Sequence, residues 1–521
     1  MPNTAKELYS QLRALPWELL WNREAARFDR AAPRERIERV AVIRAVGVVF
    51  SETGPAEQKE AVRRWLRGLL HDPGEKVRRY AMAALPKIGA GPEEEAGLLS
   101  LLQTTASARE KQFLMRTLEK IGGRATLNIV QQGDGDLPRQ TEQKVKAAIA
   151  RRESPSAIRM DGVLTDLDGV LIHLRGRRGL EGIVRDEVEA SMRAGGKFRV
   201  AGVAGGLVAI TPVAPFSLAD LYAHRCFGAA GFVLGAANSV NNTEPLAALA
   251  TVIASLLSRR ILAAFTRGTI RYRLNFMNRG HQRSAVRLLA ARVYALCPEL
   301  LNDARDVTWT MDLCADGRGR WVELRPNVTP DPRFSYRLQD IPAASHPPLA
   351  ACMARLAGRV EHEIIWDPFC GSGLELIESA LLGGVERIHG TDRSAAAIAI
   401  AQGNLAAAKV DPASTKLACC DFRDLASAGL GPNRVTLLIT NPPMGRRVPI
   451  ADLRGLMEDL FAVAATVLQP GGRLVLANPL PPETPHPSLQ LRFRQAVDFG
   501  GFDCRLEMYQ KRPHRPCSGG L

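Results

Sequence analysis

The stretch Asp367-Pro368-Phe369-Cys370-Gly371-Ser372-Gly373 decides the fold of the C-terminal part of the chain. Its glycines allow a tight turn and a close approach of the backbone to a ligand, and a helical segment begins at Leu374. Around it, short apolar segments alternate with segments of helical period. This alternation predicts an α/β domain, a doubly wound Rossmann-like sheet with right-handed crossovers and ligands at the carboxyl ends of its strands. We expect strands at 364–367, 387–392, 416–421, 435–440 and 473–477, helices at 394–408 and 452–468, and an antiparallel edge strand within 502–510.

Acidic side chains follow neighbouring strands of this predicted sheet. Asp392 ends the second strand, where its carboxylate can hold both hydroxyls of a ribose, although it could equally cap the next helix. Asp421 and Phe422 follow the third strand, where an acid can accept from an adenine amine and a ring can cover the base. The alternative for this pair is a solvated acid beside a core phenylalanine. Together with the glycine turn, these residues predict a site for a nucleoside cofactor.

The fourth predicted strand ends in Asn441-Pro442-Pro443-Met444. Proline fixes φ and lacks an N–H, so this turn directs carbonyl groups into the crevice. The Asn441 amide oxygen and the Pro442 carbonyl can then accept both hydrogens of an exocyclic NH2 group and align its nitrogen with a methyl donor. The alternative is a pair of prolines that only turn a loop. Together, the glycine turn and this motif suggest methyl transfer from S-adenosylmethionine to a planar nitrogen. The sequence shows no cluster with metal-ligand spacing, and the transfer requires no metal.

The charge of the chain indicates a polyanionic partner. The net charge is +15, whereas the hydrophobic fraction of 46% and the charged fraction of 24% are ordinary for a water-soluble protein. No Asp or Glu occurs between Glu244 and Glu299, a segment rich in arginine, whose planar fork binds phosphate and stacks on bases. We predict an RNA-facing surface here rather than a merely solvated basic face, with Tyr272 and Phe276 in the core. The predicted RNA-binding residues are Arg259, Arg260, Arg267, Arg271, Arg273, Arg279, Arg283 and Arg287.

The first part of the chain, residues 1–150, has helical period and an internal repeat. The segment 80–89 recurs as 113–122, with a weaker copy at 39–47, and each copy ends in glycine after a stripe of apolar residues. A recurring helical unit is typical of a solenoid, and the lead-in at 72–78 resembles a HEAT repeat. We therefore expect HEAT-like helical repeats, which would offer a surface for a protein partner. The alternative is a non-repetitive helical bundle.

The middle of the chain has the pattern of two α+β units, at 160–265 and 268–328. The nine cysteines contain no CxxC pair, which is the usage of a reduced compartment. The N-terminus lacks the apolar core of a secretory signal, and the apolar run 246–257 is too short to span a bilayer. We therefore expect a cytoplasmic protein that does not engage a membrane.

Residues 360–512 resemble the class I methyltransferase domain. Within them, the stretch from Asp367 to Ala380 is similar to the THUMP-containing RNA methyltransferases, a family that modifies tRNA or ribosomal RNA at guanine N2. Upstream, Arg178-Gly-Leu-Glu-Gly-Ile-Val184 resembles the opening of that family's N-terminal ferredoxin-like domain, and 343–351 resembles its pre-sheet helix. The resemblance implies a ferredoxin-like domain at 160–265, a THUMP-like RNA-binding domain at 268–328 and a methyltransferase domain at 343–512. The helical region 1–150 lies outside the family's usual plan.

The same resemblance implies roles for individual residues. The cofactor-binding residues would be Asp367, Phe369, Gly371, Gly373, Asp392, Asp421 and Phe422. Of these, Asp367 and the two glycines would line the methionine end of S-adenosylmethionine, Asp392 its ribose and Asp421 with Phe422 its adenine. The catalytic residues would be Asn441, Pro442, Pro443 and Met444, and Met444 stands where the family has an aromatic residue that stacks on the flipped base.

These observations favour a guanine-N2 methyltransferase that acts on tRNA or ribosomal RNA. Transfer to adenine N6 remains an alternative, because an Asn-Pro-Pro turn also serves that amine. A second alternative is a non-catalytic, HEAT-scaffolded RNA-binding protein that retains the cofactor fold, since Met444 departs from the family pattern.

Overall fold

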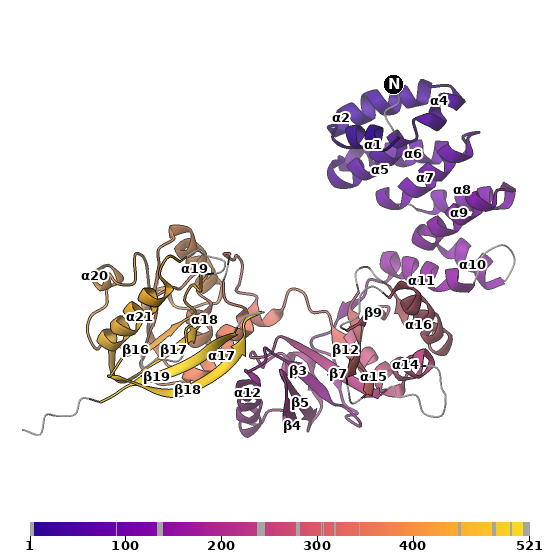
Figure 1. Ribbon diagram of the computed structural model, residues 1–521. Helices are drawn as coiled ribbons and strands as arrows, with labels where there is room; N and C mark the ends of the chain where they lie inside the picture. The colour runs from indigo at the N-terminus through magenta and orange to yellow at the C-terminus, as the bar shows by residue number, and fades with distance from the viewer. Residues whose placement is uncertain are drawn as a thin grey trace, which may run out of the picture. The chain divides into compact units, whose positions relative to one another are not determined.

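The computed structural model describes residues 5–89, 91–132, 139–236, 245–277, 282–303, 305, 307–316, 319–342, 344–445, 450–481, 486–500 and 503–513. The chain forms two compact units (Figure 1). The first unit consists of Met1–Ile158 and Ala236–Val322, and the second unit consists of Arg159–Gly235 and Glu323–Leu521.

The N-terminal part of the first unit is helical, as the period of its apolar residues predicts. Alternate helices pack on one another: α1 on α5, α5 on α7, α7 on α9 and α9 on α11. The repeated segments 80–89 and 113–122 form the C-terminal halves of α7 and α9 and the glycines that follow. The assignment of these helices to HEAT-like repeats stays a prediction. The elements are α1 (Ala5–Arg13), α2 (Trp17–Leu19), the π-helical turn η1 (Leu20–Ala25), α3 (Ala26–Arg30), α4 (Pro33–Glu38), α5 (Ala41–Thr53), η2 (Ala56–Gln58), α6 (Lys59–Leu69), α7 (Glu75–Ile88), α8 (Pro92–Thr104), α9 (Ala108–Ile121), α10 (Arg124–Gln132) and α11 (Arg139–Glu153).

Arginine–glutamate pairs join helices of this part. Arg63 on α6 donates to both carboxylate oxygens of Glu94 on α8, at 3.2 and 2.6 Å. Arg78 on α7 donates to both oxygens of Glu110 on α9, at 2.6 and 2.8 Å. Both glutamates are fully buried. Burial opposes ionisation of Glu110, but the hydrogen bonds from Arg78 and Thr105 outweigh it and lower its pKa. These buried acids therefore tie the helices together as ion pairs.

The remainder of the first unit combines strands and helices. Strand β9 lies between β10 and β11 and runs parallel to both, while β1 and β8 form a short antiparallel pair. Tyr272 on β9 is fully buried, which confirms its predicted place in the core, and Phe276 is partly buried. The elements are β1 (Ala157–Ile158), α14 (Pro245–Ile253), α15 (Leu256–Phe265), β8 (Thr266–Arg267), β9 (Arg271–Phe276), α16 (Arg283–Leu296), β10 (Leu301–Asn302) and β11 (Trp309–Asp316). Strand β12 (Gly319–Pro326) begins in this unit, which ends at Val322.

The apolar run near residue 250 forms α14 and α15. Among the described residues, no single helix is long and apolar enough to cross a membrane. Helices α14 and α15 reach that length and composition only as a pair, with a bend of 43° between them.

The second unit begins with a small α+β arrangement within Arg159–Gly235, and the bounds 160–265 of the sequence-based module stay a prediction. Its strands are antiparallel in the order β7-β3-β5-β4, and α12 packs on β4 and β5. Ile172 and Leu174 on β3 are fully buried, whereas the residues between and after them are partly exposed, which is the alternation of a strand with one core face. The elements are β2 (Val163–Leu164), β3 (Ile172–Arg175), α12 (Glu181–Arg193), β4 (Phe198–Ala204), β5 (Leu207–Pro212), β6 (Phe216–Ser217), α13 (Leu218–Leu221) and β7 (Ala229–Ala236).

The C-terminal part of the second unit is a seven-stranded sheet in the order β15-β14-β13-β16-β17-β19-β18. The first five strands are parallel, and β19 and β18 are antiparallel additions. This confirms the predicted doubly wound sheet. The predicted edge strand β19 pairs on its outer side with β18, a further strand that was not predicted and that forms the edge. The elements are η3 (Pro332–Phe334), α17 (Pro347–Ala357), β13 (Glu363–Asp367), α18 (Leu374–Leu381), β14 (Val385–Asp392), α19 (Ala395–Ala407), η4 (Pro412–Ser414), β15 (Thr415–Cys419), α20 (Leu425–Ala428), β16 (Val435–Thr440), α21 (Leu453–Val467), β17 (Leu468–Asn478), β18 (Leu489–Asp498) and β19 (Asp503–Lys511).

Helix α18 is anchored to the small α+β part of the same unit. Arg225 donates to both carboxylate oxygens of Glu378 on α18, at 2.8 and 2.7 Å. The Tyr336 hydroxyl donates to one of these oxygens at 2.5 Å. Because Glu378 is almost fully buried, these donors fix the position of α18 and of the glycine turn that precedes it.

Candidate active site

The carboxyl ends of three adjacent strands bring the predicted polar residues together. Strand β13 ends at Asp367 and lies between β14, which ends at Asp392, and β16, which ends one residue before Asn441. Because these strands are parallel, all three side chains lie at one edge of the sheet, where doubly wound folds bind ligands.

The glycine turn after β13 has a backbone that only glycine adopts without strain. Gly371 and Gly373 have φ values of 52° and 84°, in the left-handed region. A Cβ atom on Gly373 would lie 3.3 Å from the Cβ of Ala401 on α19, so the turn packs closely against that helix. The N–H of Gly371 donates to a carboxylate oxygen of Asp392 at 3.1 Å. The turn and the acid of the next strand therefore form one structure.

Asp392 is not the cap of the following helix, which was the alternative to its predicted role. The hydroxyl of Ser394 caps α19 by accepting from the N–H of Ala397 at 3.2 Å. Asp392 accepts one backbone N–H on each oxygen, from Gly371 at 3.1 Å and from Ser394 at 2.8 Å. Each carboxylate oxygen keeps a second lone pair for a further donor.

Asp421 and Phe422 differ in their surroundings. The Asp421 side chain is 33% exposed and pairs with Arg423 at 3.1 Å, and Arg423 also pairs with Asp459 at 2.7 Å. The Phe422 ring is 2% exposed and packs on Phe369, with 4.9 Å between ring centroids. The structure thus places the Phe422 ring in the core, as the alternative interpretation had it, and leaves Asp421 accessible.

Asp367 is fully buried and holds two strands together. Its Oδ1 accepts from the N–H of Phe369 at 3.0 Å and from the Thr440 hydroxyl at 2.6 Å. Burial, and then the charge of Glu375, raise the pKa of Asp367 well above its usual value, against the hydrogen bond from Thr440. Its other oxygen has no hydrogen-bond partner among the described residues.

Asn441 has one engaged end and one vacant end. Its Nδ2 donates to the Ser345 hydroxyl at 2.8 Å, and Ser345 donates in turn to Glu375 on α18. The amide oxygen Oδ1 is shielded from solvent and has no partner in the described part of the chain. Pro442 is buried, while Pro443 and Met444 are partly exposed.

The sequence reasoning missed Ser345 and Glu375. Glu375 lies in the stretch from Asp367 to Ala380, and Ser345 lies in the segment 343–351, but neither residue is part of a motif that marks its role. A buried Ser–Glu contact between segments this far apart in the chain leaves no local signal.

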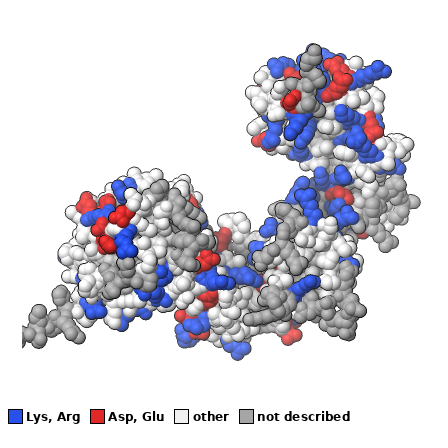
Figure 2. All heavy atoms as spheres, in the orientation of Figure 1, with Lys and Arg blue, Asp and Glu red and all other residues white. Residues whose placement is uncertain are grey.

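The predicted RNA-binding arginines belong to the first unit and differ in their exposure. The prediction that Arg271 binds RNA is wrong. The Arg271 side chain is fully buried and lies 3.7 Å from the buried carboxylate of Asp303, so it cannot face RNA in this structure. Arg279 lies outside the described residues, and Arg260 is partly buried. The remaining five are exposed, namely Arg259, Arg267, Arg273, Arg283 and Arg287. In the same unit, Figure 2 shows Lys and Arg side chains gathered in the region of α11.

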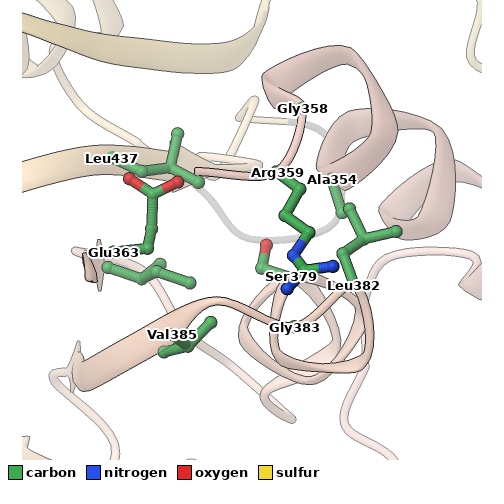
Figure 3. Close-up of a pocket in the computed structure, with 10 residues that line it drawn as sticks. Ala354, Gly358, Arg359, Glu363, Ser379, Leu382, Gly383, Val385 and Leu437 are labelled. Atoms are coloured by element: carbon green, nitrogen blue, oxygen red, sulfur yellow. The ribbon is translucent and has the colours of Figure 1, made fainter. Parts of the chain in front are cut away.

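A small hollow lies away from the candidate site, towards the opposite ends of the strands (Figure 3). It is lined by Glu363 and Val385, the first residues of β13 and β14, and by Ser379 and Gly383 around the end of α18. None of the predicted site residues lines it. In the described ranges, no group of three or more His, Cys, Asp or Glu side chains is placed to hold a metal ion.

Comparison with known proteins shows a similarity of the C-terminal part of the chain to methyltransferases. Residues 335–480 match the model of the RMKL-like methyltransferase domain. The tRNA (guanine(10)-N2)-dimethyltransferase of Methanothermobacter thermautotrophicus is 29% identical over 184 residues. That match covers 35% of this chain and 49% of the relative, so the chain spans about half the length of the curated relative.

The crystal structure of TrmN from Thermus thermophilus resembles the chain with a TM-score of 0.52 and 20% identity, over 66% of this chain and 99% of TrmN. At this identity the likeness shows a shared fold. Residues 335–480, which contain the strands β13 to β17, thus match a methyltransferase domain model, and the seven-stranded sheet belongs to a methyltransferase-like α/β fold.

Proposed function

We propose that the chain is an S-adenosylmethionine-dependent RNA methyltransferase that acts on the exocyclic N2 amine of a guanine in tRNA or ribosomal RNA. The observation that carries the proposal is the vacant Oδ1 of Asn441 at the carboxyl end of β16. A shielded acceptor without a partner costs about 1–3 kcal/mol. A substrate N–H that donates to this oxygen removes that cost, so the site selects a ligand with an amine.

The residues of the site fit the cofactor. The positive-φ turn at Gly371 and Gly373 allows close approach of the backbone, and Asp392 has free lone pairs for the two ribose hydroxyls. Asp421 is accessible for an adenine amine. When bound, S-adenosylmethionine supplies a methyl group on a positively charged sulfur. The role of the protein is then to place an amine nitrogen in line with that methyl group.

Asn441 and the prolines perform this placement. The Oδ1 of Asn441 and the carbonyl of Pro442 accept the two amine hydrogens, which directs the nitrogen lone pair away from these two oxygens. Met444 is partly exposed beside them and covers one face of the base by dispersion and sulfur–aromatic contact. The Met444 side chain offers less area than an aromatic ring, so we expect weaker retention of the flipped base.

The RNA substrate is supported by the basic first unit and by the relative that methylates tRNA at guanine N2. The five exposed arginines, which lie on α15, β8, β9 and α16, can neutralise phosphates and release counterions. In this proposal, the first unit binds structured RNA and the second unit modifies it, while the helices α1–α11, as HEAT-like repeats, offer a surface to a protein partner.

The test is methyl transfer by the purified full chain. The protein is incubated with labelled S-adenosylmethionine and total RNA from cells in which its gene is deleted, and the RNA is digested for nucleoside mass spectrometry. We expect N2-methylguanosine. N6-methyladenosine would instead establish the second candidate, which the same acceptors can serve because both bases carry an exocyclic amine. No transfer by protein that demonstrably binds the cofactor would refute an enzymatic function.

Two asparagine variants form a matched pair for this assay. N441A removes the vacant acceptor, and we expect a loss in kcat of about 100-fold, equivalent to roughly 2.7 kcal/mol. N478A removes an amide at the end of the next strand, β17. The Nδ2 of Asn478 donates to Glu507 at 2.8 Å, and its Oδ1 accepts from the N–H of Leu480 at 3.0 Å, so both ends of this amide are already bonded inside the protein. N478A is expected to retain transfer within a few-fold.

A further inference from the structure

The Asn441 amide can face its substrate with either of two ends. The oxygen end accepts a hydrogen bond from an amine, whereas the NH2 end would donate one to a carbonyl. The two ends have the same shape, so only the hydrogen bonds around the amide decide which end points into the site. In the structure, Nδ2 is engaged with the Ser345 hydroxyl at 2.8 Å, and Oδ1 is the vacant end.

The Ser345 hydroxyl has a single hydrogen, which it donates in a hydrogen bond to the carboxylate of Glu375. An ionised carboxylate can only accept, so the hydrogen of Ser345 must point towards Glu375. The oxygen of Ser345 is then left as an acceptor and can bond only the Nδ2 end of Asn441. A protonated Glu375 could donate to Ser345 instead. The serine hydrogen would then be free for Asn441, and the amide would reverse and present its NH2 end to the substrate.

We propose that Ser345 and Glu375 are positioning residues that set the polarity of the Asn441 amide, so that ionised Glu375 selects an amine as the methyl acceptor. The proposal rests on the function proposed above and assigns two residues to its specificity. Ser345 and Glu375 are 8% and 4% exposed, so water does not replace either hydrogen bond. Segments before α17, at the start of α18 and after β16 meet in this relay.

The surroundings of Glu375 make its ionisation sensitive to pH. Burial raises the pKa of Glu375, and the Ser345 hydrogen bond opposes that rise. The titratable groups that face it are Asp367 on β13, Glu378 on its own helix, Cys370 in the glycine turn and Tyr336. The acceptor polarity is therefore complete above the raised pKa of Glu375 and is lost as the pH falls through it.

The experiment measures kcat and its pH dependence for methyl transfer to total RNA from gene-deleted cells, with the purified full chain. In S345A the relay is cut, so we expect kcat to fall about 10-fold with the KM for S-adenosylmethionine unchanged within about twofold. S345T restores the hydroxyl and should recover most of the activity. E375Q removes the titrating group, so the acidic limb of the wild-type pH profile should disappear.

The matched control is S379A on the same helix. The Ser379 hydroxyl is buried and donates to the backbone carbonyl of Glu375 at 2.7 Å, so its loss disturbs α18 but leaves the relay intact. We expect S379A to keep the wild-type kcat and acidic limb. Thermal unfolding and binding of S-adenosylhomocysteine establish that each variant is folded.

Three results would overturn the inference. The first is an S345A variant that matches S379A in kcat and pH profile. The second is a reduced kcat in S345A with the acidic limb unchanged, which would indicate a merely structural role. The third is an E375Q variant that keeps the acidic limb. If the wild-type chain itself transfers no methyl group to RNA, the proposed function fails instead.

Discussion

Three glycine-to-alanine substitutions test whether the turn after β13 is a cofactor cradle built on glycine geometry. Gly371 and Gly373 have positive φ, where an alanine costs about 1–2 kcal/mol. A Cβ on Gly371 would meet the terminal Cδ1 of Ile341 at 3.2 Å, and that side chain can rotate away. A Cβ on Gly373 would meet Ala401 at 3.3 Å from its Cβ and 3.5 Å from its Cα, which belongs to the backbone of α19 and cannot move alone.

These contacts rank the two variants. Without bound cofactor, G371A should lower the free energy of unfolding of the second unit by about 1–2 kcal/mol. G373A should lower it by about 2–4 kcal/mol, because overpacking adds to the backbone strain. For a domain of this size, those losses correspond to a lower Tm by roughly 2–8 °C and roughly 5–15 °C. Gly403 on α19 provides the control, since a Cβ there meets nothing within 4 Å. G403A should leave Tm unchanged or raise it, because alanine favours a helix over glycine by about 0.5–1 kcal/mol.

Differential scanning calorimetry of the full chain gives the order of the three variants, and titration calorimetry with S-adenosylhomocysteine gives their affinities. We expect weaker binding, by about 5-fold or more, in G371A and G373A and wild-type affinity in G403A. A G373A protein as stable as G371A would refute the steric argument. Unchanged affinity in both turn variants would refute the role of the turn in holding the cofactor.

The remaining predictions concern the arginines, the base and the helical part. R267A should weaken RNA binding and reduce the salt slope by about one, measured by fluorescence anisotropy at several salt concentrations, whereas R271A should lower the Tm of the first unit and leave the slope unchanged. M444F should tighten RNA binding or lower KM by about 10-fold through stacking, and no gain in the methylation assay would contradict the proposed contact with the base. The pKa of Glu110 is lowered in the folded state, so its pair with Arg78 stabilises the helices above the ordinary pKa near 4.5 and is lost as the pH falls through the lowered value. Thermal melts followed by circular dichroism should show this acidic loss in the wild type and a smaller one in E110Q.

The strands that sequence predicts best are those buried on both faces. Val435–Thr440 was predicted with the bounds that the structure has, because an apolar run between loops is the pattern of a central parallel strand. Strand β18 was missed because most of Leu489–Asp498 is exposed, and an edge strand of this kind carries polar residues that no apolar pattern marks. Arg494 on that strand pairs across to Glu507 on β19 at 2.7 Å, a contact that no local sequence pattern predicts.

The arginine segment shows a different limit. The alternation in 271–276 predicted a strand correctly, but it does not distinguish two long side chains on the same face, such as Arg271 and Arg273. Arg271 is buried and Arg273 is exposed, because Asp303 lies where it can compensate the buried cation. The charge pattern of the segment does not show that an acid from outside it compensates one of its arginines.

In the candidate site, a local motif predicts one part of the chemistry, and residues from other segments decide the rest. The turn at Asn441 fixes where an amide lies, and the residue types of that turn already indicate an amine as the ligand. The turn does not fix which end of the amide faces outwards, because both ends fit the same space. That choice depends on the Ser345 hydroxyl and on the charge of Glu375, two buried residues from other segments. The chemistry that a short motif suggests is therefore completed by hydrogen bonds that exist only in the folded domain, and substitutions at Ser345 or Glu375 can change the reaction while the motif stays intact.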